Sequence, residues 1–136
     1  MDFDLTAEQR DIQKLCRQFA ENEIEPFVVE NLDTMWEGTQ EERFPREIFE
    51  KADEVGLRLL NVPEEYGGDG FEPDVLTQCI MFEELCTPDY SIASSMGINW
   101  KLCKALQNYP EHIQERYFPR IVEDPHFMMA HALTEP

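Results

Sequence analysis

The segment FPREIFEKADEVG, residues 44–56, shows how this chain builds its fold. Pro45 suits the first position of a helix, where its missing N–H leaves no hydrogen bond unmade. Apolar side chains then recur at three- and four-residue intervals, which places them on one stripe of a helix: Ile48, Phe49, Ala52 and Val55. Gly56 comes next, where a left-handed residue commonly ends a helix. The segment therefore predicts a short amphipathic helix with one buried face.

The chain before this segment carries the same helical pattern. Thr6 and Gln9 have the spacing of a capping box, and an apolar stripe lies beyond them at Ile12, Leu15, Cys16, Phe19 and Ala20. We expect this first helix to pass Ile24 and to bend or end at Pro26, which has no backbone N–H to donate. Residues 31–42 are acidic and irregular, and they predict a connection without helix.

The chain after the segment continues as LRLLNVPEEYGGDGF, residues 57–71. Its first part is apolar, and its second part, residues 63–70, holds too many glycines for a helix. These glycines have neither the G-x-G-x-x-G spacing nor the lysine of a phosphate-binding loop. They predict a tight turn.

Three further helices are predicted beyond this turn. Ser91 caps the second of them, which runs to Leu106, and the third lies between Pro110 and Asp124. The first opens at Pro73 and ends near residue 87, with an apolar stripe at Leu76, Cys79, Ile80 and Leu85. A chain of 136 residues is long enough for one domain with a hydrophobic core. The sequence thus predicts an all-α helical bundle domain.

Composition excludes several classes of function. The formal net charge is -18, from 29 acidic against 11 basic residues, and such a surface repels the phosphate backbone of nucleic acids. No run approaches the roughly 18 to 20 apolar residues that a membrane span requires. The first residues lack the basic start and apolar stretch of a signal peptide. We expect a cytoplasmic protein without nucleic-acid partners.

Candidate catalytic and metal-binding groups are few. The four cysteines lie among apolar neighbours without a C-x-x-C pair, and they predict buried free thiols: Cys16, Cys79, Cys86 and Cys103. The three histidines are not spaced as a zinc set, so no metal site is expected. Acidic doublets such as Glu83-Glu84 arise by chance in so acidic a chain, and none has the partner that a catalyst needs.

Five segments, in order, resemble the N-terminal helical domain of the acyl-CoA dehydrogenase family. They are FPREIFEKADEVGL (44–57), VPEEYGGDG (62–70), FEELC (82–86), ERYFPRIVE (115–123) and HALTEP (131–136). In that family A-L-T-E-P marks the passage from the helical domain into a central β domain. The resemblance implies an N-terminal α-helical domain over residues 1–130, with residues 131–136 starting the middle β domain. We expect the rest of that domain to be absent from this chain, which would end at the junction.

The resemblance also implies a function. Family members bind FAD and remove two hydrogens from the α and β carbons of an acyl-CoA thioester, in fatty acid metabolism. They pass electrons to electron-transfer flavoprotein or a similar acceptor, and they assemble as homotetramers or dimers. Their catalytic base is a glutamate of a C-terminal domain, so no catalytic residue is assigned here and this piece alone is expected to be inactive. Two alternatives stay open: another flavoenzyme of the fold (acyl-CoA oxidase, desulfinase or hydroxylase-like), and a non-enzymatic helical interaction module.

Individual site residues are implied by the resemblance as well. His131, Leu133 and Thr134 match the strand that contacts FAD, although an aromatic residue is common at position 131. Substrate contacts are expected between Ser91 and Asn99, where the matching part of the family lines the acyl cavity. The candidates there are the small residues Ala93, Ser94 and Ser95, and Trp100 is expected to close the cavity.

Overall fold

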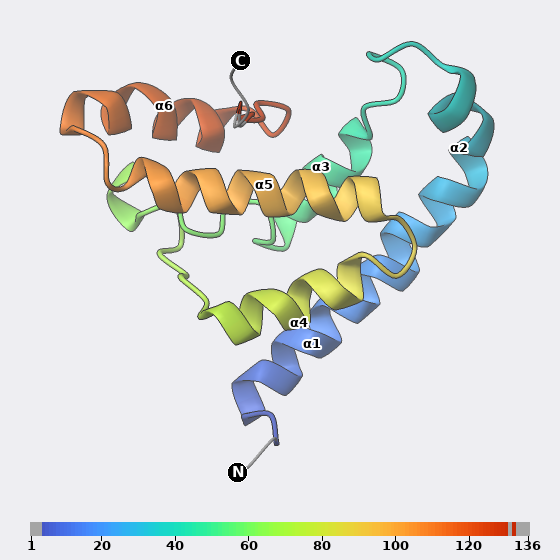
Figure 1. Ribbon diagram of the computed structural model, residues 1–136, viewed down its shortest axis with the longest axis horizontal. Coiled ribbons are helices and arrows are strands. Elements are labelled where there is room, and N and C mark those ends of the chain that lie inside the picture. The colour runs from blue at the N-terminus through green and yellow to red at the C-terminus, as the bar shows by residue number, and fades with distance from the viewer. Residues whose placement is uncertain (1–3, 131, 133–136) are drawn as a thin grey trace. The chain divides into compact units, whose positions relative to one another are not determined.

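The computed structural model describes residues 4–130 and 132, and these residues form helices and no β-strand, which confirms the all-α prediction (Figure 1). The elements are α1 Ala7–Phe19, the π turn η1 Ala20–Ile24, α2 Glu25–Glu37, α3 Arg46–Glu54, the 3₁₀ turn η2 Glu64–Tyr66, α4 Val75–Leu85, α5 Tyr90–Leu106 and α6 Glu111–Glu123. The chain divides into two compact units, Met1–Pro45 with Pro73–Ser94, and Arg46–Glu72 with Ser95–Pro136.

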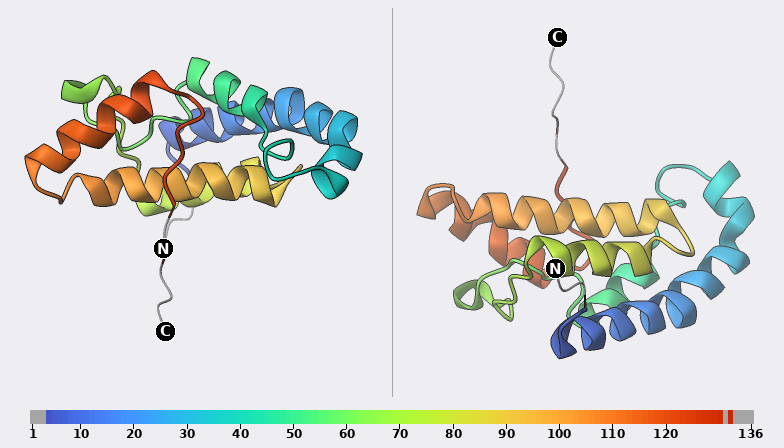
Figure 2. Two further views of the ribbon diagram at one scale, coloured as in Figure 1. Left: turned by 90° about the horizontal axis from the view of Figure 1, so that it is seen from above. Right: turned by 60° about the horizontal axis from the view of Figure 1, so that its bottom comes forward.

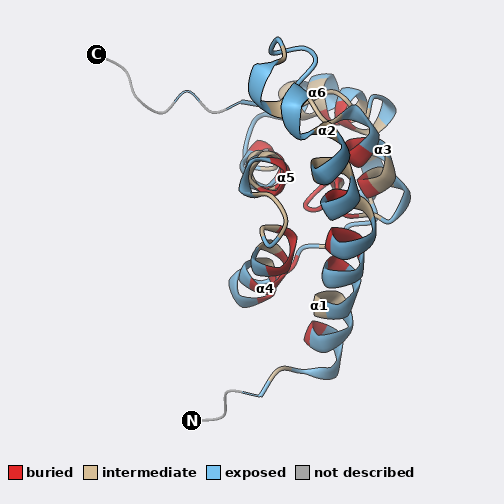
Figure 3. Cartoon of the chain, turned by 90° about the vertical axis from the view of Figure 1, so that its right-hand side faces the viewer, coloured by how far each residue is buried: buried red, intermediate tan, exposed pale blue. Residues whose placement is uncertain are grey.

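In the first unit, α1 packs against α4. The predicted capping box is present, since the N–H of Gln9 donates to the Thr6 hydroxyl at 3.1 Å and the N–H of Thr6 donates to the Gln9 side chain at 3.0 Å. The amide of Gln9 also donates to the hydroxyl of Thr77 on α4, at 3.3 Å. Buried residues lie along one side of α1 (Figure 3). The helix is thus fixed both at its start and along its inner face.

The helical run passes Ile24 as expected, and Pro26 does not end it. The N–H of Glu25 bonds to the carbonyl of Ala20, five residues earlier, and this wider π turn places Pro26 in the first turn of α2. A proline there leaves no hydrogen bond unmade. The kink falls instead at Asn31 (φ -111°, ψ 15°), whose side-chain amide donates to the carbonyl of Phe27 at 2.9 Å. The predicted irregular connection over 31–42 is therefore wrong for its first half, because α2 continues to Glu37.

The inner face of α4 also differs from the prediction. Leu76 and Cys79 are exposed, and the buried residues are Thr77, Ile80, Met81, Glu84 and Leu85. The two polar side chains among them can be buried because each has a hydrogen-bonding partner on α1. The predicted stripe is therefore confirmed at Ile80 and Leu85 and wrong at Leu76 and Cys79. The prediction of four buried thiols is correspondingly wrong for Cys79.

The start of α5 shows a further correction. The Asp89 carboxylate accepts the N–H of Ile92 at 2.9 Å and the hydroxyl of Ser91. Asp89, and not Ser91, therefore supplies the side chain that caps this helix.

In the second unit, α3 buries Ile48, Phe49 and Ala52 as predicted. Val55 is 43% exposed, because α3 ends at Glu54 and Gly56 turns the chain with φ 75°. The glycine-rich stretch forms the predicted tight turn, in which a Cβ on Gly68 would meet the carbonyl oxygen of Val62 at 2.1 Å.

The last two helices complete the second unit. α6 begins after Pro110 and ends before Asp124, as predicted, and it turns back beside the C-terminal half of α5 (Figures 1 and 2). The ring of Tyr66 stacks on that of Phe118, with centroids 4.9 Å apart. The core between these elements consists of Val62, Cys103, Leu106, Phe118 and Ile121.

Candidate functional site

An apolar groove lies in the second unit, along the ends of α5 and α6 and the segment that comes after α6. Its volume is about 350 Å³. It is lined by Leu102, Ala105, Leu106, Tyr109, Ile113, Tyr117, Phe127, Met128, Met129 and Ala130. α5 and α6 form two sides of the groove, and residues 127–130 form a third side. We call this surface the apolar groove.

α5 is apolar on two faces within this unit. Its buried face carries Met96, Asn99, Trp100, Cys103 and Leu106, at the spacing of one helical stripe. Its other face carries Ile98, Leu102 and Ala105, none of them buried. A helix that meets water on one side normally turns polar residues outward, so an apolar outer face indicates a binding surface.

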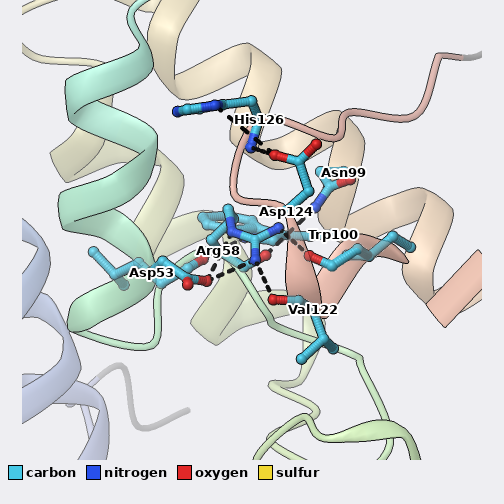
Figure 4. Close-up of polar contacts among 9 residues, drawn as sticks. Asp53, Arg58, Asn99, Trp100, Val122, Asp124 and His126 are labelled. Carbon is cyan, nitrogen blue, oxygen red and sulfur yellow. Dashed lines mark hydrogen bonds and ion pairs between the residues drawn. The ribbon is translucent and has the colours of Figure 1, made fainter. Parts of the chain in front are cut away.

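Arg58 forms the centre of a buried polar cluster (Figure 4). Its side chain is 0% exposed, and its guanidinium pairs with the carboxylate of Asp53 at 2.7 and 2.8 Å. The same guanidinium donates to the carbonyl oxygens of Ile121 at 2.5 Å and Val122 at 3.5 Å. Those carbonyls belong to the last turn of α6, where helical hydrogen bonds run out and a positive charge is favourable. Arg58 thus supplies hydrogen-bond donors to carbonyl groups at the end of α6, which have no partner within the helix.

Three more side chains connect residues 57–61 to α5. The indole N–H of Trp100 donates to the carbonyl of Leu57 at 2.6 Å, and the amide of Asn61 donates to the carbonyl of Trp100 at 3.1 Å. The amide of Asn99 donates to the carbonyl of Arg58 at 3.4 Å. Trp100 is 2% exposed, so its ring belongs to the interior of the unit, and its expected role in closing an acyl cavity stays a prediction.

His126 holds the turn at the end of α6 (Figure 4). Its Nε2 lies 2.9 Å from the carboxylate of Glu50 on α3, and its backbone N–H donates to the side chain of Asp124 at 2.9 Å. The N–H of Phe127 donates to the carbonyl of Asp124 at 3.0 Å. The chain therefore leaves α6 through a closed turn that is fixed to α3.

The residues expected to contact FAD, His131, Leu133 and Thr134, lie outside the described residues. Of the candidates for substrate contact, Ala93 is fully buried, whereas Ser94 and Ser95 are half-buried. Sequence reasoning missed Arg58, although a signal was present. A charged residue inside the apolar run LRLL, residues 57–60, predicts a buried and paired charge.

In the acidic doublet Glu83-Glu84, the carboxylate of Glu84 is already paired. Glu84 accepts hydrogen bonds from Arg17 at 2.6 and 2.8 Å and from Gln13 at 2.8 Å. The bond from Arg17, above all, holds the pKa of this carboxyl below its usual range, so it stays ionised and paired. Within residues 4–130 and 132, no three His, Cys, Asp or Glu side chains gather as metal ligands would. None of the described helices is long and apolar enough to cross a bilayer.

Comparisons with known proteins agree with this architecture. Residues 6–124 match the family model described as "Acyl-CoA dehydrogenase, N-terminal domain". The chain is 39% identical over 137 residues to acryloyl-CoA reductase (NADH) of Anaerotignum propionicum, covering 100% of this chain and 32% of that protein. It is 33% identical over 138 residues to the short-chain specific acyl-CoA dehydrogenase of Clostridium acetobutylicum, covering 100% of this chain and 34% of that protein.

A solved structure is similar as well. It is described as "Electron transferring flavoprotein of Acidaminococcus fermentans: Towards a mechanism of flavin-based electron bifurcation", and one of its chains matches with a TM-score of 0.67 at 29% identity. The match covers 93% of this chain and 31% of that chain. This chain therefore spans about a third of the length of the relatives that it matches.

Proposed function

The chain belongs to the acyl-CoA dehydrogenase family as its N-terminal helical domain, and we therefore propose that the whole protein is an FAD-dependent oxidoreductase. Its reaction would be transfer of two hydrogens at the α and β carbons of an acyl-CoA thioester. The observation that carries the proposal is the similarity to two acyl-CoA enzymes along the full length of this chain, residues 131–136 included.

We propose that residues 133 and 134 contribute to one wall of a flavin site. The chemistry of their side chains supports this, since Thr134 has a hydroxyl and a backbone N–H to donate and Leu133 has an apolar side chain. The glycine-rich turn is no cradle for the pyrophosphate, because Gly68 already lies against the backbone of Val62. The remaining cofactor contacts would come from outside this chain. Bound FAD supplies the two-electron acceptor for a hydride from the β carbon.

We propose that this chain helps to bind and orient the acyl-CoA substrate and the flavin. The base that accepts the proton would lie in a C-terminal part outside this chain. Ser94 and Ser95 would form part of the wall against the acyl chain, since both are half-buried small residues on α5. A second domain would cover the apolar groove and the outer face of α5, which would exclude water from the site. Transfer of electrons to an electron-transfer flavoprotein, a homo-oligomeric assembly and a cytoplasmic location are parts of the same proposal.

A short acyl group is the favoured substrate class. The names of the relatives from Anaerotignum propionicum and Clostridium acetobutylicum state either a three-carbon acyl group, acryloyl, or short-chain specificity. One of them is named a reductase, and this favours a second candidate function: the same chemistry run toward the saturated acyl-CoA. The two candidates differ in direction and in the electron donor or acceptor.

The test is the flavin spectrum of the whole protein, expressed from the complete reading frame and kept anaerobic. Bleaching of the oxidised flavin by a short saturated acyl-CoA would support dehydrogenation. Return of colour when an enoyl-CoA is added to the reduced protein, without bleaching by the saturated compound, would favour the reductase. A colourless protein that binds no added FAD would refute both candidates.

A further inference from the structure

α2 exposes three large apolar side chains to solvent (Figure 3). Val29 is 73% exposed, Leu32 51% and Trp36 75%. Leu32 and Trp36 stand four residues apart beyond the kink at Asn31, and Val29 lies one turn before Leu32. None of the thirteen residues of α2, all of which the structure describes, is buried. The core of the first unit therefore does not account for these three positions, which we call the outer stripe.

Carboxylates lie beside the outer stripe. Glu30, Asp33 and Glu37 each follow a member of the stripe by one residue, and all three are exposed. We call them the acidic row. No lysine or arginine lies between Arg17 and Arg43, whereas this part of the chain carries many acids: Glu21, Glu23, Glu25, Glu30, Asp33, Glu37, Glu41 and Glu42. A protein surface that covered the stripe would therefore meet negative charge beside it.

The end of α2 is held in place, so Trp36 is presented on a fixed backbone. The N–H of Gly38 donates to the carbonyl of Thr34 at 2.9 Å. Arg43 folds back on the same end, and its guanidinium donates to the carbonyls of Trp36 at 2.8 Å and Gly38 at 2.6 Å. These bonds occupy carbonyls that the end of a helix leaves without partners. Tryptophan loses little conformational freedom on binding and is common among the residues that dominate interface energies.

We propose that the outer stripe is a docking site for a separate protein, whose surface presents apolar side chains with lysines or arginines beside them. The acidic row distinguishes this partner from other occupants. A second copy of this chain would bring the same row and a net charge of -18, and facing like charges oppose association. A permanent cover by another part of the same protein would resemble a domain interior, where charged residues are depleted. Charges alongside an apolar stripe are instead typical of an interface that forms and dissociates.

The test uses the whole protein and a defined probe, a synthetic helical peptide with leucines along one face and lysines beside them. Its affinity is measured by fluorescence anisotropy of the labelled peptide. The emission of Trp36 is obtained as the difference between wild type and Trp36→Phe. We expect the peptide to bind and to move this emission to shorter wavelength, because docking removes the indole from water. The absence of binding would refute the proposal.

The charge of the probe has its own control. The same peptide with glutamates in place of the lysines keeps the apolar face and reverses the charge, so it should not bind. Equal binding of the two peptides would refute the charge complementarity on which the choice of partner rests.

Two valines of the first unit give a matched pair of variants. Val29→Ser removes a member of the outer stripe, and Val75→Ser makes the same change at a valine of α4 that is 77% exposed. We expect Val29→Ser to weaken binding of the lysine peptide at least about fivefold and Val75→Ser to change it by less than about twofold. Equal affinities of the two variants would show that the peptide binds elsewhere, and this would overturn the proposal.

The acidic row has a control of equal charge. Glu30→Gln, Asp33→Asn and Glu37→Gln, combined in one variant, should weaken binding of the lysine peptide and reduce its dependence on salt concentration. A second variant loses three exposed carboxylates of α6 and should bind the peptide as wild type does: Glu111→Gln, Glu115→Gln and Glu123→Gln. An equal loss of affinity in both variants would mean that the overall charge attracts the peptide, which would refute the role of the row.

Two further measurements test the other occupants. Acrylamide should quench the emission of Trp36 in the whole protein without peptide, and a lack of quenching would mean that another part of the same protein covers the stripe. Sedimentation equilibrium should give the same mass for wild type and Val29→Ser. A lower mass for the variant would mean that a second copy occupies the stripe. Either contrary result would overturn the docking of a separate partner.

Discussion

The indole of Trp100 donates its N–H to the carbonyl oxygen of Leu57 across 2.6 Å, although 43 residues separate the two in sequence. The bond joins the middle of α5 to the segment that comes after α3, inside the second unit. A buried carbonyl that loses its donor keeps the full cost of its desolvation. Loss of this hydrogen bond should therefore lower the stability of the second unit.

Trp100→Phe should lower the free energy of unfolding by about 1 to 3 kcal/mol, because it leaves the carbonyl of Leu57 without that donor and removes part of a buried ring. Urea denaturation followed by circular dichroism measures the loss. Trp36→Phe is the control, since Trp36 is 75% exposed and its replacement should change stability by less than about 0.5 kcal/mol. Equal effects of the two substitutions would contradict the buried role of Trp100.

The glycine-rich turn allows a comparison of two alanine substitutions. Gly68→Ala would force a Cβ to within 2.1 Å of the Val62 carbonyl oxygen, so the backbone must shift. Gly56→Ala meets no close atom but must adopt φ 75°, which costs about 1 to 2 kcal/mol. We expect the loss of thermal stability to be clearly larger for Gly68→Ala. The opposite order would show that the turn relaxes easily.

The four thiols should react with iodoacetamide at very different rates at pH 8. Burial raises the pKa of both Cys16 and Cys103 to about 12, so only about one molecule in ten thousand carries either thiolate. Burial and the nearby Asp89 also raise the pKa of the half-buried Cys86.

Mass spectrometry of the folded protein should accordingly find Cys79 labelled first, because its side chain is exposed. Cys86 should react next and slowly, and the two buried thiols should react only in denaturant. Early labelling of Cys16 would mean that α1 separates from α4 in solution.

The stability of the first unit should depend on pH through Glu84. The hydrogen bond from Arg17 lowers the pKa of its carboxyl below the usual value of 4.5, so the folded state gains stability above about pH 4.5 and loses it as the pH falls through the lowered value. Glu84→Gln should therefore melt below wild type at pH 7, and the difference should shrink in acid. Arg17 is more than half exposed, which keeps the effect modest. Glu83→Gln, one residue earlier and exposed, serves as the control and should show no such convergence.

The helices that the sequence predicted well are those with local signals. The capping box at Thr6, Pro45 before α3 and Pro110 before α6 each act within a few residues, and each marks a boundary correctly. The errors arose where residues distant in the sequence determine which side chains are buried. Thr77 and Glu84 can be buried because side chains of α1 donate hydrogen bonds to them. The sequence of α4 alone does not indicate these partners.

The candidate site was predictable only in part. The substrate contacts expected at Ala93, Ser94 and Ser95 of α5 stay predictions from the sequence. The polar cluster was not found, because the bond from Arg58 to Ile121 joins residues 63 apart in the chain. The apolar groove likewise depends on the pairing of α5 with α6 and not on any one segment.

The π turn at Ala20–Ile24 makes the facing of α2 depend on a single residue. Each residue of an α-helix advances the chain by about 100° around the axis, so a turn that holds one residue more than usual offsets everything after it by that angle. If the turn took ordinary α-helical winding with the sequence unchanged, the apolar positions Val29, Leu32 and Trp36 would rotate together by about 100° to another side. Pro26 would then fall inside an uninterrupted helix, where proline is strongly unfavourable. The facing of α2 and its tolerance of Pro26 therefore both depend on the π turn.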